Sequence, residues 1–470
     1  MHKKRAKFDV VVIGSGPGGE GAAMQATKSG LKTALVERQD RVGGNCTHFA
    51  TIPSKTLRHV AHRITTFQND SFFNTSVHSK ANFTHILERS KHVISQQVAR
   101  RAGHYTRNTV KVYHGEASLK NSTCVLVKGD GDHIEQLTTK NIVIATGSKP
   151  NHPLHIDFNH HNIFDSDSIT KMNYSPKKII IYGAGVVGCE YASIFNSLGA
   201  KVTLINRHND LLNFLDHEIK NALSYHFRDK GIHIRHSEEC EKVELKDKKV
   251  QVTLTSGKKI IANTLLATLG RRGDIENLGT AIVGIETTDK GHIIVNEHYQ
   301  TSVPNIYAVG DLTGFPCLAS SAYDQGRFAA LHIIDPDCDN SLVKDVPVGI
   351  YTSPEISSIG QTEQQLTKNK IPYEAGHVAF KNLARAQITD QTVGMLKLLF
   401  HAESLEILGI HCFGQNAAEI VHIGQAIMAQ PVPNNTLQYF VNTTFNYPTM
   451  AEAYRVAALN GMNRLSNKEN

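Results

Sequence analysis

The chain has 470 residues, of which 40% are hydrophobic and 20% charged, and its net charge is +7. The length exceeds what one hydrophobic core supports and predicts about three domains. Lys and Arg are spread along the chain without a basic run interleaved with aromatics, and no apolar stretch approaches the roughly 20 residues of a membrane span, so neither a nucleic-acid nor a membrane partner is expected.

The seven cysteines are widely scattered and include no C-x-x-C pair. This usage is typical of a reducing compartment and argues against a disulfide framework. The basic residues 2–7 precede a short strand ending in glycines rather than the apolar segment of a signal peptide, so we expect a cytoplasmic location. The histidines between 151 and 176 lack compact metal-ligand spacing; we interpret them as solvated loop residues and expect no metal site.

An internal repeat determines the layout of the first half. Residues 8–37 have the pattern strand, glycine-rich turn, helix and strand, and residues 178–206 repeat it. The second strand ends at Glu37 in one copy and at Asn206 in the other. Each copy carries a G-x-G-x-x-G fingerprint, whose glycines let a pyrophosphate approach the backbone at a helix N-terminus, so two bound dinucleotides are implied. The fingerprint glycines are Gly14, Gly16 and Gly19 in the first copy and Gly183, Gly185 and Gly188 in the second.

The remaining segments complete a three-part arrangement. A buried-type strand at 141–147 enters a turn at Thr146 and Gly147, an irregular polar linker is expected at 151–176, and a second such strand ends at Asp311 before a helix at 319–333. Beyond residue 346 we expect strands at 395–400 and 406–413 and a helix at 417–429. These patterns predict an α/β fold with two Rossmann-like dinucleotide-binding domains and a C-terminal α+β domain. The expected boundaries are 1–150 and 276–345 for the first domain, 151–275 for the second and 346–470 for the third.

A segment with a single cysteine, residues 43–55, reads Gly-Gly-Asn-Cys-Thr-His-Phe-Ala-Thr-Ile-Pro-Ser-Lys. Together with the two fingerprints and the Gly-Asp ending at Asp311, it resembles the flavoprotein disulfide reductases, or pyridine nucleotide-disulfide oxidoreductases, over essentially the full chain. In that family a second cysteine five residues after the first completes a redox-active disulfide. Here Thr51 takes that position, so Cys46 has no partner for such a bond.

The resemblance implies that the first fingerprint binds FAD. Glu37 is expected on the adenosine ribose, where a carboxylate can accept both hydroxyls. Asp311 is expected on the ribityl chain, with a helix N-cap as the alternative role. Lys55 is expected beside flavin N5, paired with Glu190 from the helix of the second fingerprint, and a cation there favours anionic reduced flavin. The alternative for Lys55 is a surface position on a helix that starts near Ser54. The expected FAD set is Gly14, Gly16, Gly19, Glu37, Cys46, Lys55, Thr146, Gly147 and Asp311.

The second fingerprint is expected to bind NAD(H) and NADP(H) as substrates. A carboxylate at position 206 would repel the 2′-phosphate of NADP by about 4 kcal/mol at an effective dielectric near 20. Asn206 removes that repulsion and can still hydrogen-bond a hydroxyl, while Arg207 can meet a phosphate. Acceptance of both cofactors is the simplest interpretation; the alternative is that Arg207 is a solvated loop residue. The expected NAD(P) set is Gly183, Gly185, Gly188, Asn206, Arg207 and Gly270.

A second departure from the family lies near the C-terminus. Disulfide reductases carry His-Pro-x-x-x-Glu there, supplied across a dimer interface, whereas this chain has Tyr447 and Glu452 at the two positions. The resemblance therefore implies a homodimer or larger homo-oligomer, with Tyr447, Glu452, Cys46 and Thr51 near the flavin. A tyrosine, with a reference pKa of about 10, is a poor proton carrier for thiols. Thr449 and Glu452 also have the spacing of a capping box.

The second thiol and its proton carrier are absent together, which suggests that the dithiol half-reaction is not performed. The runs 14–24, 43–55 and 442–462 are similar to the soluble pyridine nucleotide transhydrogenase branch of the family. That similarity implies an oxidoreductase that transfers hydride from NADPH to NAD+ through FAD by a ping-pong route, with Lys55 and Glu190 as its catalytic pair. The alternatives are an NAD(P)H oxidase or diaphorase using Cys46 or free flavin, and a non-catalytic dinucleotide-sensing flavoprotein.

Overall fold

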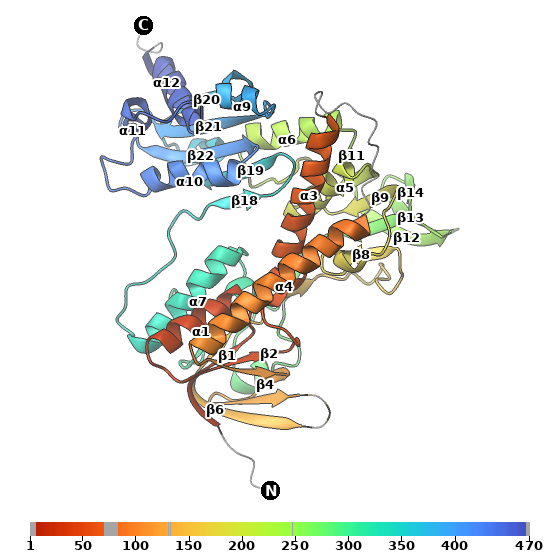
Figure 1. Cartoon of the computed structure of the whole chain (residues 1–470), viewed down its shortest axis with the longest axis vertical. Helices are drawn as coiled ribbons and strands as arrows, with labels where there is room; N and C mark the ends of the chain where they lie inside the picture. Colours follow the sequence, from red (N-terminus) through yellow and green to blue (C-terminus); the bar gives the residue numbers. More distant parts are fainter. Residues whose placement is uncertain (1–5, 70–82, 130, 132, 247, 467–470) are drawn as a thin grey trace.

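The computed structural model describes residues 6–69, 83–129, 131, 133–246 and 248–466. Figure 1 shows three lobes: an N-terminal lobe around β1, β6, α1 and α7, a second lobe around β9 and α5, and a C-terminal lobe around β19–β22. Two long helices, α3 (Thr51–Asn69) and α4 (Phe83–Arg107), pack against each other between the lobes, and their apolar side chains, including Leu57 and Phe83, join the core of the second lobe. The predicted fold class is confirmed.

The N-terminal lobe contains a mixed sheet in the order β3-β2-β1-β6-β5-β4, with β17 also pairing with β6. Alternate residues of β1 belong to different cores: Val10 and Val12 pack on one face of the sheet, Val11 and Ile13 on the other. A parallel sheet covered on both faces explains why these strands are continuous apolar runs in the sequence. The elements are β1 (Ala6–Ile13), α1 (Pro17–Lys28), β2 (Thr33–Glu37), α2 (Gly44–His48), β3 (Lys111–His114), β4 (Glu116–Asn121), β5 (Cys124–Lys128), β6 (Ile134–Ile144), η3 (Thr280–Val283), β17 (Ile306–Ala308), η4 (Gly310–Thr313) and α7 (Ala319–Ile334).

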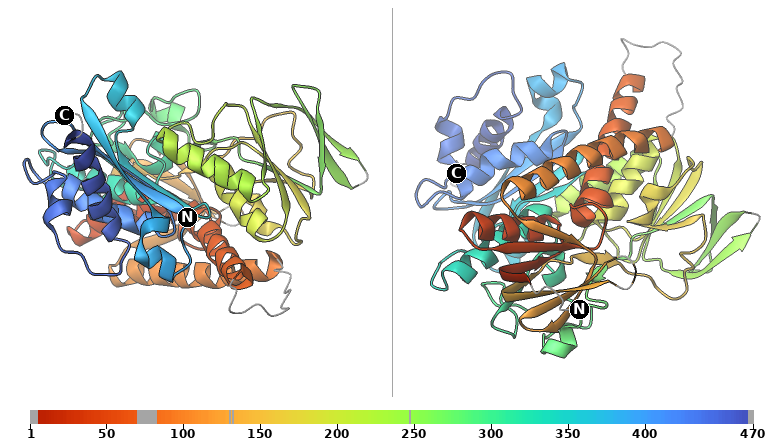
Figure 2. Two further views of the ribbon diagram at one scale, coloured as in Figure 1. Left: turned by 90° about the horizontal axis from the view of Figure 1, so that it is seen from above. Right: turned by 60° about the horizontal axis from the view of Figure 1, so that its bottom comes forward.

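The second lobe has a parallel sheet in the order β11-β10-β9-β15-β8, and the smaller sheet β12-β13-β14 projects from its outer edge (Figure 2). The expectation of an irregular linker at 151–176 is wrong in part, because β8 (Ile163–Asp165) is a strand of the main sheet and η2 (Ser168–Lys171) follows it. Three residues are too few to show a strand period in the sequence. The other elements are β7 (Ser148–Pro150), β9 (Lys178–Tyr182), α5 (Val186–Ser197), β10 (Lys201–Asn206), α6 (His217–Asp229), β11 (His233–His236), β12 (Cys240–Lys246), β13 (Lys249–Leu254), β14 (Lys259–Ala262), β15 (Thr264–Ala267) and β16 (Arg271–Gly273), which pairs with β7.

The C-terminal lobe is an antiparallel sheet in the order β18-β19-β22-β21-β20, with α10 and α12 packed on it. The strands predicted at 395–400 and 406–413 and the helix at 417–429 are confirmed as β21, β22 and α10, each within one residue or so of its expected ends. The elements are β18 (Val348–Ile350), β19 (Glu355–Gly360), α8 (Glu363–Lys368), β20 (Tyr373–Ala379), η5 (Phe380–Asn382), α9 (Ala384–Ile388), β21 (Gly394–His401), β22 (Ile407–Gly414), α10 (Ala417–Met428), α11 (Gln438–Asn442) and α12 (Glu452–Ser466). Within the described ranges, no helix combines the length and apolarity needed to cross a membrane.

A buried ion cluster joins the C-terminal lobe to the second lobe. Lys397 on β21 has a fully buried side chain, and its ammonium lies 2.8 Å from Asp216, the N-cap of α6, and 2.5 Å from Glu363. Burial opposes ionisation of Asp216, but the hydrogen bond and charge of Lys397 hold the pKa of this carboxyl below its usual value. Because both side chains are fully buried, water cannot replace either partner, and this contact between the two lobes is costly to break.

Lys397→Met should lower the free energy of unfolding by about 3–5 kcal/mol, since it leaves the buried Asp216 carboxylate without its cation. The deficit should be full near neutral pH and shrink below about pH 4, because the depressed pKa of Asp216 makes its contribution disappear as the carboxyl is protonated. Urea denaturation at several pH values measures this. The control is Lys242→Met, which removes the exposed Lys242–Glu244 pair and should cost less than about 1 kcal/mol; equal losses in the two variants would contradict the prediction.

Candidate active site

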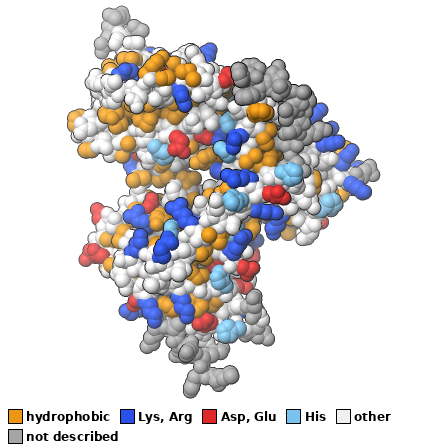
Figure 3. Space-filling view, viewed as in Figure 1, with side chains coloured by type: hydrophobic (Ala, Val, Ile, Leu, Met, Phe, Trp, Pro, Cys, Tyr) orange, Lys and Arg blue, Asp and Glu red, His pale blue; other side chains and the backbone are white. Residues whose placement is uncertain are grey.

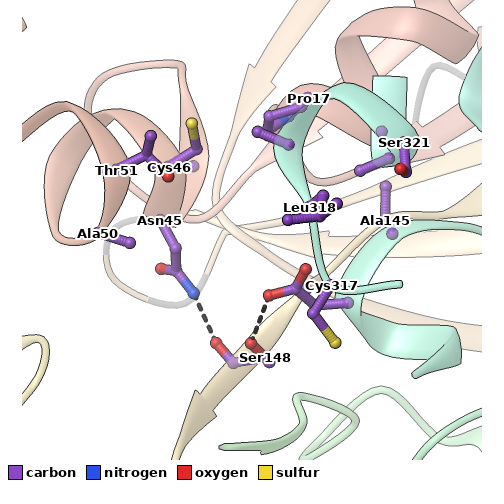
Figure 4. Close-up of a pocket in the computed structure, with 18 of the residues that line it drawn as sticks. Pro17, Asn45, Cys46, Ala50, Thr51, Ala145, Ser148, Cys317, Leu318 and Ser321 are labelled. Carbon is purple, nitrogen blue, oxygen red and sulfur yellow. Dashed lines mark hydrogen bonds between the residues drawn. The ribbon is translucent and has the colours of Figure 1, made fainter. Parts of the chain in front are cut away.

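One cavity of about 970 Å³ lies where the three lobes meet. Its walls come from the first fingerprint, the Cys46 segment, α5, the segment before α7 and the start of the C-terminal lobe. Figure 3 shows a hollow between the C-terminal and N-terminal lobes, and Figure 4 shows part of the cavity wall in detail. The volume is within the usual range for cofactor and ligand sites. Eight of the nine residues expected at FAD line the cavity: Gly14, Gly16, Glu37, Cys46, Lys55, Thr146, Gly147 and Asp311; Thr51 and Glu190 line it as well.

The two fingerprints have the same local geometry. Gly14 and Gly183 have φ of +102° and +107°, and a Cβ on either would lie 2.3 Å from a carbonyl oxygen of the adjacent strand end. A Cβ on Gly19 or Gly188 would lie within 1.9 Å of the carbonyl oxygen of the first glycine of its own copy. The third glycine therefore has a packing role, which explains why Gly19 does not line the cavity.

The first fingerprint fits a dinucleotide. The helix α1 begins after Gly16, which has no side chain to cap the first-turn N–H groups, so these groups remain available to a pyrophosphate. At the end of β2, Glu37 accepts hydrogen bonds from the N–H and hydroxyl of Ser15, and its carboxylate faces the cavity. The hydroxyls of Thr146 and Ser321 also lie at the cavity and are buried without a hydrogen-bond partner among the described residues. Unmet donors around a glycine cradle are what a bound FAD would satisfy.

Asp311 is anchored by a short hydrogen-bond chain. Arg271 Nε donates to Ser148 Oγ (2.7 Å), which donates to Asp311 Oδ2 (2.8 Å), and Asn45 Nδ2 donates to the carbonyl oxygen of Ser148 (2.5 Å; Figure 4). Asp311 lies inside the short helix η4 and not at its N-cap, which is Val309. The alternative role as an N-cap is therefore wrong, because η4 begins at Gly310, before Asp311.

Lys55 and Glu190 form an ion pair at the cavity. The Lys55 ammonium lies 2.7 Å from Glu190 Oε2, and the exposed fractions of the two side chains are 28% and 5%. The other carboxylate oxygen accepts the backbone N–H of Tyr351 at 2.9 Å, and the Lys55 ammonium lies 4.9 Å from the centre of the Tyr351 ring. The surface alternative for Lys55 is wrong: α3 begins at Thr51, three residues before the expected start near Ser54, and the Lys55 side chain lines the cavity.

A second ion pair at this end of α3 was not predicted. Arg58 donates to Glu355 Oε1 at 2.6 Å and to the carbonyl oxygen of Thr352 at 3.2 Å, and Glu355 Oε2 accepts the N–H of Ala418. Arg58 follows Lys55 by three residues, so a helical reading places both on one face of α3. That spacing was the one sequence feature that could have indicated a second cation beside Lys55. The acidic partner comes from another lobe, nearly 300 positions later, and the sequence gives no indication of it.

Thr51 lies against Cys46. Burial raises the pKa of the Cys46 thiol above its usual value, and a hydrogen bond with Thr51 acts in the opposite direction. Figure 4 shows both residues on neighbouring helical turns facing the same space. All seven cysteines are unpaired. Where a disulfide would require a second sulfur, this site has the Thr51 hydroxyl beside the buried Cys46 thiol.

The residues expected at the nicotinamide dinucleotide lie at the edge of the second sheet, outside the main cavity. A Cβ on Gly185 or Gly270 would meet open space, so the backbone there is accessible to a ligand. Asn206 is buried; its Nδ2 donates to the carbonyl oxygen of Asp210 (2.9 Å) and lies 3.1 Å from His236 Nδ1, and its Oδ1 accepts the N–H of His208. One N–H of the amide is thus bound to Asp210, and the amide oxygen retains an acceptor lone pair to offer a ribose. Arg207 is exposed and donates to His208 Nε2 at 3.2 Å.

Tyr447 and Glu452 do not line the cavity of their own chain. Tyr447 is 72% exposed on the C-terminal lobe, and Glu452 is the first residue of α12. The Thr449 hydroxyl donates to the carbonyl oxygen of Asn446 at 2.8 Å, and the Glu452 N–H donates to the carbonyl oxygen of Thr449 at 3.4 Å. These two bonds are not those of a capping box, in which the Thr449 hydroxyl would accept the Glu452 N–H and the Glu452 side chain would accept the Thr449 N–H.

Two Rossmann-like units that meet at a cavity with a Lys–Glu ion pair define an oxidoreductase of two dinucleotides. The chain belongs to the pyridine nucleotide-disulphide oxidoreductase family, whose model matches residues 8–326, while the model of the family's dimerisation domain matches residues 346–458. The expected family resemblance and oxidoreductase class are confirmed.

Relatives and solved structures agree with this placement. The chain is 55% identical to a soluble pyridine nucleotide transhydrogenase of Pectobacterium atrosepticum over 97% of this chain and 98% of that one. It is 56% identical to the protein of the same name from Photorhabdus laumondii over 97% of this chain and 99% of that one. The HOCl-induced flavoprotein disulfide reductase RclA from Escherichia coli has the same fold, with a TM-score of 0.87 over 96% of this chain and 99% of that one, at 23% identity.

Thr51→Val should shift the pH at which Cys46 becomes reactive to higher values, because the variant loses the hydrogen bond that lowers the pKa of this thiol while burial continues to raise it. Alkylation of Cys46 by iodoacetamide, followed by peptide mass spectrometry from pH 7 to 10, measures the profile in the FAD-loaded enzyme. In the unaltered enzyme Cys46 should react more slowly than N-acetylcysteine at pH 7.5. A Cys46 that reacts faster than N-acetylcysteine would contradict the pKa raised by burial, and an unchanged profile in the variant would show that the hydroxyl has no such role.

Proposed function

We propose that the protein transfers hydride from NADPH to NAD+, giving NADP+ and NADH, without a redox-active disulfide. The observation that carries the proposal is the site around Cys46: Thr51 hydrogen-bonds the thiol in the position of a second sulfur, while the surrounding cavity and the Lys55–Glu190 pair are complete. The full-length relatives named soluble pyridine nucleotide transhydrogenase, at 54–56% identity, support the same activity.

The chain's own residues divide the work between binding and electrostatics. FAD, when bound, would supply the centre that takes hydride from one dinucleotide and returns it to another. Glu37, Asp311 and the N-terminus of α1 would hold it, and Lys55 would place a positive charge beside the site where negative charge develops. Glu190, fixed by the Tyr351 N–H, would keep that ammonium in position. None of these roles requires a thiolate or an external proton donor.

Both nicotinamide dinucleotides would use one site at the second fingerprint. Asn206 is neutral and offers an acceptor to a ribose hydroxyl, and Arg207 offers a cation to a 2′-phosphate. A ping-pong exchange needs this tolerance, because the donor leaves before the acceptor enters the same site. We assign Gly183, Gly185, Gly188 and Gly270 to the backbone that this dinucleotide approaches.

The assembly and location are part of the proposal. The match of residues 346–458 to a dimerisation domain supports a homo-oligomer, and the exposed Tyr447 would reach the cavity of a second copy together with Glu452. We propose residues 1–150 and 276–345 as the FAD domain, 151–275 as the NAD(P) domain and 346–470 as the dimerisation domain. Seven unpaired cysteines support a cytoplasmic location.

The direct test is anaerobic hydride transfer from NADPH to thio-NAD+ by the FAD-loaded enzyme. Cys46→Ser should retain turnover within about threefold, whereas Lys55→Met should lose about 10²-fold, because it removes the preorganised charge beside the reacting centre. Glu190→Gln should lose less than Lys55→Met, since the amide oxygen can still accept the Tyr351 N–H. Loss of activity in Cys46→Ser alone would point to thiol chemistry. Absence of turnover in the unaltered, FAD-loaded enzyme would leave a dinucleotide-binding protein and contradict the proposal.

Cofactor choice can be tested separately at the end of β10. Arg207→Glu should raise the KM for NADPH about tenfold and change that for NADH less than about twofold, because losing an exposed attraction and adding a repulsion is worth about 1.4 kcal/mol. The matched control is Lys201→Glu, the same charge reversal at the opposite, exposed end of β10. Steady-state kinetics with each donor measures both. Equal effects on the two donors would remove Arg207 from phosphate recognition.

A further inference from the structure

A second concave region lies outside the dinucleotide cavity, between α1, α4 and α7. It encloses about 560 Å³ and shares no lining residue with the larger cavity. Three helices supply its side chains: α1 and α7, which pack closely against each other, and the C-terminal half of α4. Its lining residues are Glu20, Met24, Lys28, Gln97, Arg100, Arg101, His104, Arg107, Asn108 and Tyr323.

The region is strongly cationic. Four of its side chains are Lys or Arg, and Glu20 is the one carboxylate among its lining residues. Arg101 neutralises Glu20 at 2.9 Å, and both side chains are largely buried, with exposed fractions of 15% and 13%. Lys28, Arg100 and Arg107 then have no carboxylate partner within the part of the chain that the structure describes. Figure 3 shows Lys and Arg side chains gathered on the N-terminal lobe over these helices.

Helix dipoles explain part of this arrangement. Lys28 is the last residue of α1 and Arg107 the last of α4, and cations are favourable at helix C-termini. The dipoles do not explain why two helix ends converge on one hollow or why Arg100 lies two turns earlier. Arg100, His104 and Arg107 follow the i, i+4, i+7 spacing of one helix face, so α4 presents a continuous basic stripe to the hollow.

The arrangement of the arginine side chains favours a ligand with phosphate groups. Arg101 is held by two contacts, Nε to Glu20 and Nη1 to Gln97 Oε1 (2.9 Å), so its guanidinium is oriented before any ligand arrives. One guanidinium group can donate two parallel hydrogen bonds to two oxygens of a phosphate. Arg100 and Arg107, which have no carboxylate partner among the described residues, lie on the same face of α4 as each other. Tyr323, 37% exposed, adds an aromatic ring to the wall, next to Met24.

We propose that this α1–α4–α7 hollow binds a small anion with a pyrophosphate group, separately from the dinucleotide substrates. The basic stripe of α4 binds the phosphates, and the Tyr323 ring stacks on an aromatic base when the pyrophosphate belongs to a nucleotide. The inference does not depend on the proposed hydride transfer, since it rests on residues that do not line the larger cavity.

Isothermal titration of the FAD-loaded enzyme at constant ionic strength tests the site with sodium pyrophosphate and with ADP. Substitutions on α4 leave the NAD(P) site unchanged, so the part of the binding that they remove belongs to the hollow. Arg100→Gln/Arg107→Gln should weaken binding at least tenfold. The matched control Arg89→Gln/Lys91→Gln removes two exposed charges from the other half of α4 and should bind as the unaltered enzyme does.

Tyr323→Leu distinguishes the two sources of the pyrophosphate group. Weaker ADP binding with unchanged pyrophosphate binding identifies a nucleotide site, and unchanged binding of both identifies an inorganic anion site; either supports the proposal. Absence of binding to the unaltered enzyme would overturn it. Equal losses in the Arg100/Arg107 variant and in the control would also overturn it, because they would show a general effect of net charge.

Discussion

The ion pair between Lys55 and Glu190 is the constraint on which the site depends. It joins the helix that follows the Cys46 segment to the helix of the second fingerprint, and Glu190 is also bound by a backbone N–H of the C-terminal lobe. Three lobes therefore meet at one carboxylate. A partly buried pair of this kind is costly to break, because each charge would be left in a poorly hydrated place. The position of the reactive charge is thus set by the packing of the whole chain.

The chemistry of Cys46 follows from its surroundings rather than from its identity. A thiolate is the nucleophile and the electron carrier of cysteine. Burial raises the pKa of Cys46 and favours the thiol, although the Thr51 hydroxyl acts in the opposite direction. The flavoprotein architecture is retained while the route from the flavin site to an external disulfide is closed. With that route absent, the nicotinamide site becomes both the entrance and the exit for electrons.

Much of the fold could be predicted from the sequence because its signals are local. The two fingerprints give strand, turn and helix within 30 residues, and β2 and β10 end at Glu37 and Asn206 as expected. The three-residue strand β8 was missed because it is shorter than any readable period. Arg58–Glu355 and the Tyr351 contact to Glu190 were missed for a different reason: each joins residues far apart in the chain, and only the docking of the C-terminal lobe brings them together. The contacts of Asn206 with Asp210 and His236 could not be predicted either, because they depend on how later residues fold back beside the strand end.

Residues 351–355 connect the C-terminal sheet to the reactive end of the cavity. In this segment the Tyr351 N–H binds Glu190 of α5, and Thr352 and Glu355 bind Arg58 of α3. The segment therefore contacts both helices that carry the Lys55–Glu190 pair. A displacement of the C-terminal sheet would move these anchor points together. The sheet that matches the family's dimerisation domain is therefore mechanically coupled to the ammonium of Lys55.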